Sequence, residues 1–322
     1  MIIAILILIL LTSCQMDYDK GDIYYLSYAT NYSNGKNLDS LKRLNGTMHD
    51  TDGLHHALSL YSEEYDKDYF YYNIRLKYEG GKDDNDYKTL TVDNNSDKNL
   101  NCTSKKPKDY DWDNEELTKN FINFTNEFKS KIKDNDIVIF AFSGHGAEDT
   151  GILALDEGIN IALEQTGNTE GIYEFMSAFK GNKIIILDSC FSGNIINADG
   201  DSSYTSHISD IYKKLDAKYG TRNNMYLIAA SSADKLSYED SITDETFNSD
   251  SHNKHSHGQL FKKILTELNY VCTDDYNTPG HVTDFKRVSY SSICSKIKPS
   301  IANLFSSDHQ FKQTPYNLEI FY

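Results

Sequence analysis

A histidine and a cysteine each follow an apolar segment of the chain. His145 belongs to Ser143-Gly144-His145-Gly146, after the run 136–142, and Cys190 belongs to Asp188-Ser189-Cys190-Phe191-Ser192-Gly193, after the run 183–187. Apolar runs of this length, rich in β-branched and aromatic residues, are typical of strands buried on both faces. Ligands of an open α/β sheet bind beyond the carboxyl ends of its strands. The pattern therefore predicts an imidazole close to a thiol, the pair that nucleophilic catalysis by cysteine requires.

Strands and helices alternate along the segments that would position these two residues. Further strands are predicted at 23–29, 69–76, 225–230 and 313–322, and helices at 44–64, 113–132, 169–179, 260–268 and 288–304. This alternation indicates an α/β fold with a mainly parallel six-stranded sheet and helices on both faces. The polar segment 79–112 is predicted to be a long loop, and 147–167 a short turn-rich connection. Loops as long as the first are uncommon unless they are functional or disordered.

The chain of 322 residues is acidic, with 48 Asp and Glu against 32 Lys and Arg and a net charge of −16. Binding of nucleic acid relies on a cationic face, so the charge argues against a nucleic-acid partner. An acidic chain is compatible with a cationic substrate, although a solvated acidic surface explains the same charge. No Cys/His cluster of the sequence has the spacing of a zinc site, and no metal ligands are assigned.

The N-terminal segment 1–14 has the pattern of a signal peptide. Its apolar run 2–11 is about half of the roughly 20 residues that a membrane-spanning helix needs. Leu11-Thr12-Ser13-Cys14 resembles a bacterial lipobox, in which cleavage exposes a cysteine that is then lipidated. We expect a lipoprotein attached to a membrane through Cys14, or otherwise a periplasmic or secreted protein, with 15–21 as a linker. An uncleaved hydrophobic anchor is the alternative, and both place the domain outside the cytoplasm.

The ordered pair of motifs, SGHG after one strand and DSCFSG after the next, resembles the caspase–metacaspase family of cysteine peptidases. The segment 44–54 resembles the Gly-x-x-x-Asp segment of that family, 257–261 its His-Gly-x-Phe-Thr helix start, and 313–315 its C-terminal signature. The resemblance covers about 22–322, without 79–112. It implies the caspase-like (caspase–hemoglobinase) fold, with a large part at about 22–200, a linker at 201–223 and a small part at 224–322.

This resemblance implies a cysteine endopeptidase with a Cys-His dyad that needs no cofactor for its chemistry. A free thiol has a pKa of about 8.5 and only the thiolate attacks well, so His145 would activate Cys190 and then protonate the leaving amine. By the family's pattern, the backbone N–H groups of Gly146 and Cys190 form the oxyanion hole. A core histidine and an inert buried thiol are the structural alternative.

Substrate choice is predicted from acids near the nucleophile. The resemblance assigns Asp188, two residues before Cys190, and Asp50 to the substrate pocket, with Ser143 and Thr47 lining it. Two carboxylates would pair with a guanidinium or an ammonium group, which predicts a peptide or protein substrate cleaved after Arg or Lys. An acid at a helix start also favours the helix dipole, which is a sufficient structural reason for Asp50.

Calcium is a candidate activator, because the resemblance is to a family in which many metacaspases need it. The candidate ligands are carboxylates on the loop after SGHG and past the cysteine strand: Glu148, Asp149, Asp156, Glu157, Asp199 and Asp201. Calcium takes about six to eight oxygen ligands, and this set does not establish a site.

Three further possibilities follow from the sequence. The linker 201–223 holds Lys213, Lys214, Lys218 and Arg222, where an Arg/Lys-specific enzyme could cleave itself, or which form a solvated basic loop. A catalytically silent caspase-like binding module is an alternative function, against which the intact His145 and Cys190 count. A same-clan peptidase cutting after Asp or Asn is another, against which the two pocket acids count.

Overall fold

The structure is a computed structural model of the chain. It describes residues 21–32, 44, 46–79, 87–95, 101–107, 110, 112–148, 152–156, 159–162, 170–195, 225–231, 237, 239, 257–273, 279–289, 293 and 319–321. The signal segment 1–14 with Cys14, the linker 15–21 apart from Gly21, and the linker 201–223 with its basic residues lie outside the described residues.

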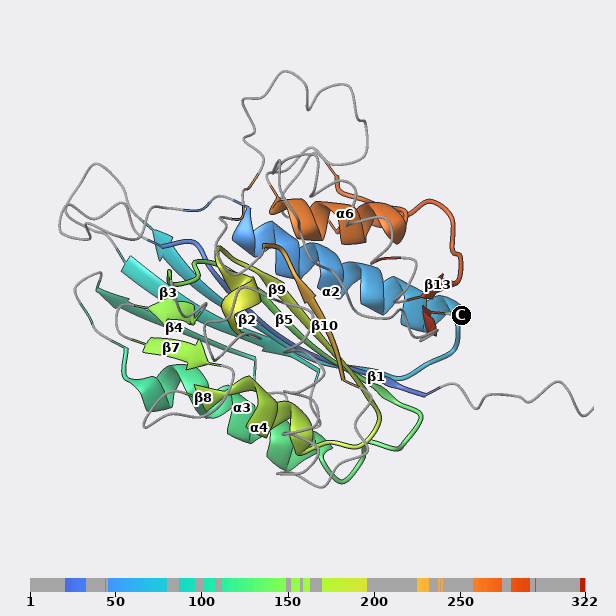
Figure 1. Cartoon of the computed structure of the whole chain (residues 1–322), viewed down its shortest axis with the longest axis horizontal. Coiled ribbons are helices and arrows are strands. Elements are labelled where there is room, and N and C mark those ends of the chain that lie inside the picture. The colour runs from blue at the N-terminus through green and yellow to red at the C-terminus, as the bar shows by residue number, and fades with distance from the viewer. Residues whose placement is uncertain are drawn as a thin grey trace, which may run out of the picture.

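A central sheet organises the described part of the chain (Figure 1). Its seven strands there lie in the order β10-β9-β5-β1-β2-β3-β4. Five of them run parallel: β1 (Ile23–Thr30), β2 (Tyr69–Glu79), β5 (Ile137–Ser143), β9 (Asn182–Asp188) and β10 (Met225–Ala229). These are five of the six predicted strands, and the predicted α/β class of fold is confirmed.

Helices cover both faces of the sheet, as predicted (Figure 1). One face carries α2 (Thr47–Glu64) and α6 (Gln259–Glu267), and the other carries α3 (Asn114–Phe128) and α4 (Ile172–Ser177). Alternate residues of β1 serve the two layers: Tyr24 and Leu26 pack toward α3, and Tyr25 packs toward α2. Since every residue of β1 and β5 is buried, these two strands form the centre of the core.

The predicted loop at 79–112 is wrong, because two strands lie within it. β3 (Tyr87–Asn94) pairs antiparallel with β2, and β4 (Cys102–Pro107) pairs antiparallel with β3. In the described part of the chain the sheet therefore has seven strands rather than six, and an antiparallel edge. Inward residues of β3 such as Leu90 and Val92 alternate with polar ones, so a composition dominated by Lys, Thr, Asp and Asn hides a half-buried strand.

The predicted turn-rich segment 147–167 is also partly regular. It contains β6 (Leu153–Asp156) and β7 (Ile159–Ala162), which pair antiparallel, and β8 (Glu170–Gly171) joins β7 in a small separate sheet. Gly146 forms a bridge with Leu153, so this small sheet directly supports the segment that follows β5.

The C-terminal part differs from the prediction. Residues 288 and 289 form β13 (Val288–Ser289) instead of a helix start, and β13 pairs antiparallel with β14 (Glu319–Phe321). The predicted closing strand thus joins a two-stranded sheet rather than the central one. A second small ribbon is formed by β11 (Tyr270–Val271) and β12 (His281–Val282), after α6. No helix of the described residues is long and apolar enough to cross a membrane.

Candidate active site

The ends of β5 and β9 bring the two predicted catalytic residues to one edge of the sheet. Ser143 and Asp188 are paired as the last residues of these parallel strands, and the N–H of Gly144 donates to the carbonyl of Asp188 at 3.1 Å. His145 and Cys190 each lie two residues beyond this pair. The two motifs that the sequence singles out therefore leave the sheet side by side.

Gly146 and Cys190 touch through their backbones. A Cβ added to Gly146 would overlap the carbonyl oxygen of Cys190 and would lie 3.0 Å from the hydroxyl of Ser189. Only glycine allows the two loops to approach this closely. The backbone segments predicted to supply the oxyanion hole are thus adjacent.

Tyr32 holds the backbone of His145. The N–H of His145 donates to the Tyr32 hydroxyl at 2.8 Å, and that hydroxyl donates to the carbonyl of Ala154 at 2.5 Å. The rings of Tyr32 and His145 lie with centroids 4.4 Å apart. Ala154 returns a hydrogen bond from its N–H to the carbonyl of His145 at 3.0 Å, so both backbone groups of the histidine are fixed.

The thiol of Cys190 lies against Ser237. The N–H of Ser237 donates to Sγ at 3.4 Å, and its carbonyl oxygen lies 3.6 Å from Sγ. Burial raises the pKa of the Cys190 thiol above its ordinary value, and the negative charge of Asp188 acts in the same direction. The thiol is therefore mainly protonated at neutral pH and needs a base to become a nucleophile.

The turn that carries Cys190 is fastened to the end of β10. Phe191, directly after the cysteine, has a φ of 54°, a conformation that bulky side chains rarely adopt. The hydroxyl of Ser231 accepts the N–H of Ser192 at 3.2 Å, and the N–H of Gly193 donates to the carbonyl of Ser231 at 3.0 Å. These bonds hold the strained turn, which continues into a 3₁₀ helix, η1 (Ser192–Ile195).

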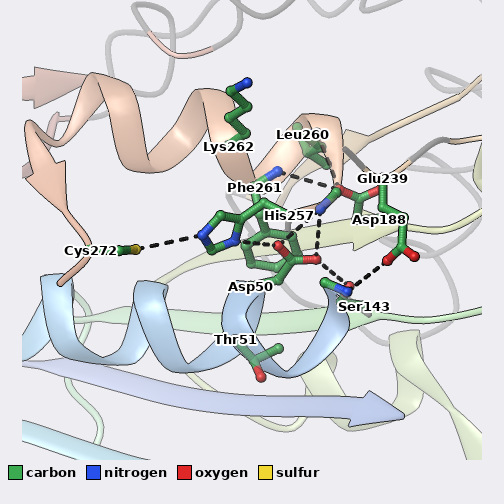
Figure 2. A network of polar contacts seen from close by, with 12 residues as sticks. Asp50, Thr51, Ser143, Asp188, Glu239, His257, Leu260, Phe261, Lys262 and Cys272 are labelled. Carbon is green, nitrogen blue, oxygen red and sulfur yellow. Dashed lines mark hydrogen bonds and ion pairs between the residues drawn. The ribbon is translucent and has the colours of Figure 1, made fainter. Parts of the chain in front are cut away.

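Asp50 is fully buried in the first turn of α2 and accepts hydrogen bonds from the end of β5 and from the segment before α6 (Figure 2). Ser143 Oγ donates to Oδ2 at 2.6 Å, His257 Nδ1 lies 2.8 Å from Oδ1, and the N–H of Gly258 lies 3.1 and 3.2 Å from the two oxygens. Ser143 and Asp50, both predicted to line the substrate pocket, are therefore in direct contact.

Asp188 lies close to Gly258, as Asp50 does, and contacts the start of α6 (Figure 2). Its Oδ1 accepts the Ser237 hydroxyl at 2.6 Å, and its Oδ2 accepts the backbone N–H groups of Leu260 and Phe261 at the start of α6, at 3.2 and 3.4 Å. Burial, with the charge of Asp50 second, raises the pKa of Asp188 to about 7, although these hydrogen bonds oppose the shift. Two carboxylates held so close in a buried place repel each other, so one gains a proton readily.

Gly258 separates the two acids. A Cβ at this position would overlap the Asp188 carboxylate and come within 3.1 Å of Asp50 Oδ2. Gly258 pairs with Glu239 in an antiparallel bridge. The Glu239 carboxylate accepts a hydrogen bond of 2.7 Å from the N–H of Gly46, the residue directly before α2. The acids are thus enclosed by the starts of α2 and α6.

Thr47, the fourth predicted pocket residue, is buried in the first turn of α2, and its hydroxyl has no hydrogen-bond partner among the described residues. Sequence reasoning assigned no role to several neighbours of the site: Tyr32, Ser237, Gly258, Cys272 and His257. Only His257 and Gly258 carried a signal, as part of the segment 257–261, because the other three have no local pattern that marks them.

Two of the six candidate calcium ligands, Glu148 and Asp156, are among the described residues, and Asp149, Glu157, Asp199 and Asp201 lie outside them. Asp156 is buried and its carboxylate is paired with Lys88 Nζ at 3.0 Å and with the Tyr78 hydroxyl. Glu148 is the other described member of the candidate ligands, and no group of three or more His, Cys, Asp or Glu side chains in the described residues could hold a metal ion.

These features define a caspase-like α/β protein. It has a mainly parallel sheet with helices on both faces, a thiol and an imidazole after neighbouring strands, and two acids near them. The family model described as "Caspase domain" matches residues 29–318. The chain therefore belongs to the caspase-domain family of cysteine peptidases.

Among solved structures, the chain is similar to a secreted C11 cysteine protease from Bacteroides thetaiotaomicron, solved with an irreversible peptide inhibitor. The identity is 15% and the TM-score 0.23, over 62% of this chain and 59% of that one. No curated protein matches the chain.

Proposed function

We propose that this protein is a cysteine endopeptidase that cleaves peptide bonds after Arg or Lys, with Cys190 as nucleophile and His145 as base. The observation that carries the proposal is the adjacency of the two strand-end loops, with Gly146 packed on the Cys190 backbone. Membership of the caspase-domain family supports the same chemistry.

The reaction would begin with transfer of the Cys190 proton to His145. The thiolate then attacks the scissile carbonyl carbon, and the N–H groups of Gly146 and Cys190 receive the developing oxyanion. The C–N bond breaks as His145 returns the proton to the leaving amine, which leaves an acyl-enzyme. Water, deprotonated by His145, attacks the acyl carbon and releases the thiol. The raised pKa of Cys190 makes the base essential.

The preference for Arg or Lys is supported by the two acids, Asp50 and Asp188, on either side of Gly258. Both are buried, so a cationic side chain that reached them would be paired in a low-dielectric site and would gain more than on the surface. An acidic side chain would meet repulsion there, and a neutral one would gain no pairing of opposite charges.

Hydrolysis of matched fluorogenic peptides ending in Arg, Lys, Asp or Asn tests this function, using the purified full chain in reducing buffer. We expect cleavage after Arg and Lys that is lost in Cys190→Ser and retained in Cys102→Ser, whose thiol is exposed on β4. Cleavage after Asp or Asn would favour the same-clan alternative. Silence toward all peptides would favour a binding module.

Three further parts of the proposal have separate tests. Self-processing within 201–223 would give two fragments on a denaturing gel, absent in Cys190→Ser. Calcium activation would appear as a rate that rises with added Ca²⁺ and falls with a chelator. Export and lipidation at Cys14 would place the protein in the membrane fraction, and Cys14→Ser would release it.

A further inference from the structure

A second cysteine and a second histidine lie beside Asp50 (Figure 2). Cys272 Sγ lies 3.6 Å from His257 Nε2, and His257 Nδ1 lies 2.8 Å from Asp50 Oδ1. The three residues come from different places: Asp50 from α2, His257 from the segment before α6, and Cys272 from the residue after β11. His257 is fully buried, and Cys272 is partly exposed.

The donors and acceptors in the series Cys272–His257–Asp50 follow from the chemistry of the three side chains. An ionised carboxylate only accepts, so Nδ1 of His257 carries the hydrogen that Asp50 receives. In the neutral imidazole Nε2 is then an acceptor. Burial raises the pKa of the Cys272 thiol to about 12, so the thiol keeps its hydrogen and donates it to Nε2. One tautomer of His257 therefore satisfies both neighbours.

Through His257, this series of hydrogen bonds reaches Oδ1 of Asp50, the carboxylate oxygen that Ser143 does not contact. Ser143 Oγ donates to Oδ2, and His257 donates to Oδ1, so the carboxylate is held from both ends. Burial and a neighbouring carboxylate both disfavour the ionised form of an acid, so every donor to Asp50, including His257, helps to offset these two effects.

We propose that His257 is a positioning and specificity-determining residue: it keeps Asp50 ionised and correctly oriented for the cationic side chain of the substrate, and Cys272 fixes the His257 ring. The inference rests on the proposed cleavage after Arg or Lys. It concerns recognition of the substrate and leaves the chemical step to Cys190 and His145.

Peptides ending in arginine and in citrulline separate charge from shape, because citrulline is a neutral isostere of arginine. The ratio of their kcat/KM values is measured for the wild type, His257→Ala and His257→Asn. The Asn amide N–H stands in for Nδ1–H, whereas Ala supplies no donor. We expect the ratio to fall at least about tenfold in His257→Ala, mostly through KM for the arginine peptide, because a buried acceptor loses its donor. In His257→Asn most of the ratio should return.

Cys272 supplies a second pair of variants. Cys272→Ser keeps a donor toward Nε2 and should retain the ratio, whereas Cys272→Ala removes it and should lower the ratio a few-fold. This pair tests the inference even where His257→Ala does not fold. Alkylation of Cys190 by iodoacetamide, followed by mass spectrometry of the Cys190 peptide, should proceed at the wild-type rate in all four variants.

An unchanged arginine-to-citrulline ratio in folded His257→Ala and in Cys272→Ala would overturn the inference while the proposed function stands. Equal defects in His257→Ala and His257→Asn, with slowed alkylation of Cys190, would also overturn it, because the residue would then support the whole site. A wild type that cleaves after neither Arg nor Lys would overturn the proposed function itself, and the inference with it.

Discussion

Tyr32 and His145 are joined both by a hydrogen bond and by ring contact. The hydroxyl of Tyr32 accepts the N–H of His145 at 2.8 Å, and their ring centroids are 4.4 Å apart. Tyr32 follows β1 and has a φ of 52°, a conformation that is unfavourable for a bulky residue. This backbone conformation accompanies the contact between its ring and that of His145. The relationship makes Tyr32 a support for the proposed base.

Tyr32→Phe should therefore lower kcat for the arginine peptide about tenfold, with little change in KM. The ring remains, but the N–H of His145 loses its acceptor and the imidazole is less well placed. Steady-state kinetics check this. Tyr28→Phe is the matched control, since it removes a buried hydroxyl that donates to the carbonyl of Leu117 on α3. An equal loss of kcat in both variants would contradict a specific role for Tyr32.

Gly146→Ala should abolish peptide cleavage. The new Cβ would overlap the carbonyl oxygen of Cys190, so the two loops must move apart and the oxyanion donors with them. Activity and melting temperature are measured together. Gly53→Ala, within α2, places its Cβ 3.0 Å from the flexible side chain of Leu265 and should stay active. Retained cleavage in Gly146→Ala would refute the close approach of the loops.

The preference for a basic residue should increase as the pH rises through about 7. The pKa of Asp188 is raised to about 7 by burial and by Asp50. The charge of Asp188, which adds to that of Asp50, is therefore present mainly above that pH. The arginine-to-citrulline ratio of kcat/KM between pH 5.5 and 8.5 checks this, and Asp188→Asn should give a flat profile. A wild-type ratio that does not vary with pH would count against the coupling of the two acids.

The same shift predicts the direction of the stability change. Asp188 binds its proton more tightly in the folded protein than in the unfolded chain, because its folded pKa of about 7 exceeds the ordinary aspartate value of 3.8. The contribution of protonated Asp188 to the free energy of unfolding is therefore fully present below about pH 4, and it is lost as the pH rises through about 7. Melting temperatures of Asp188→Asn should fall less over that window than those of the wild type.

Lys88→Ala should destabilise the fold by about 3 kcal/mol, because it leaves the buried Asp156 without its counter-charge. Urea unfolding measures the loss. Lys180→Ala is the matched control: it removes an exposed ion pair with Asp134 and should change stability by less than about 1 kcal/mol. Equal effects of the two substitutions would show that the Lys88 pair is not buried in solution.

The sequence predicts those parts of the fold whose residues carry a pattern of their own. β5 and β9 are continuous apolar runs, and α3 shows helical spacing with Asp113 as its cap, where the side chain accepts the N–H of Glu116 at 2.6 Å. β3 was missed because Lys88 points inward. A buried lysine looks like a loop residue until its partner Asp156, from the distant β6, is known.

The residues of the candidate site also differ in whether a local sequence pattern marks them. Cys190, His145 and the acids Asp50 and Asp188 stand in short motifs and could be named from the sequence. Cys272 and Tyr32 could not, because their contacts with His257 and His145 arise only in the folded chain and no local motif encodes them.

The acids and their partners come from both sides of the segment 196–224. Asp50, Ser143 and Asp188 precede it, whereas Ser237, His257 and Gly258 follow it. The pairing of β9 with β10 also spans it. A chain cut there would therefore remain a single particle, a heterodimer of its own fragments. Neither fragment alone would contain a complete pocket, so separation by denaturant should erase activity and mixing during refolding should restore it.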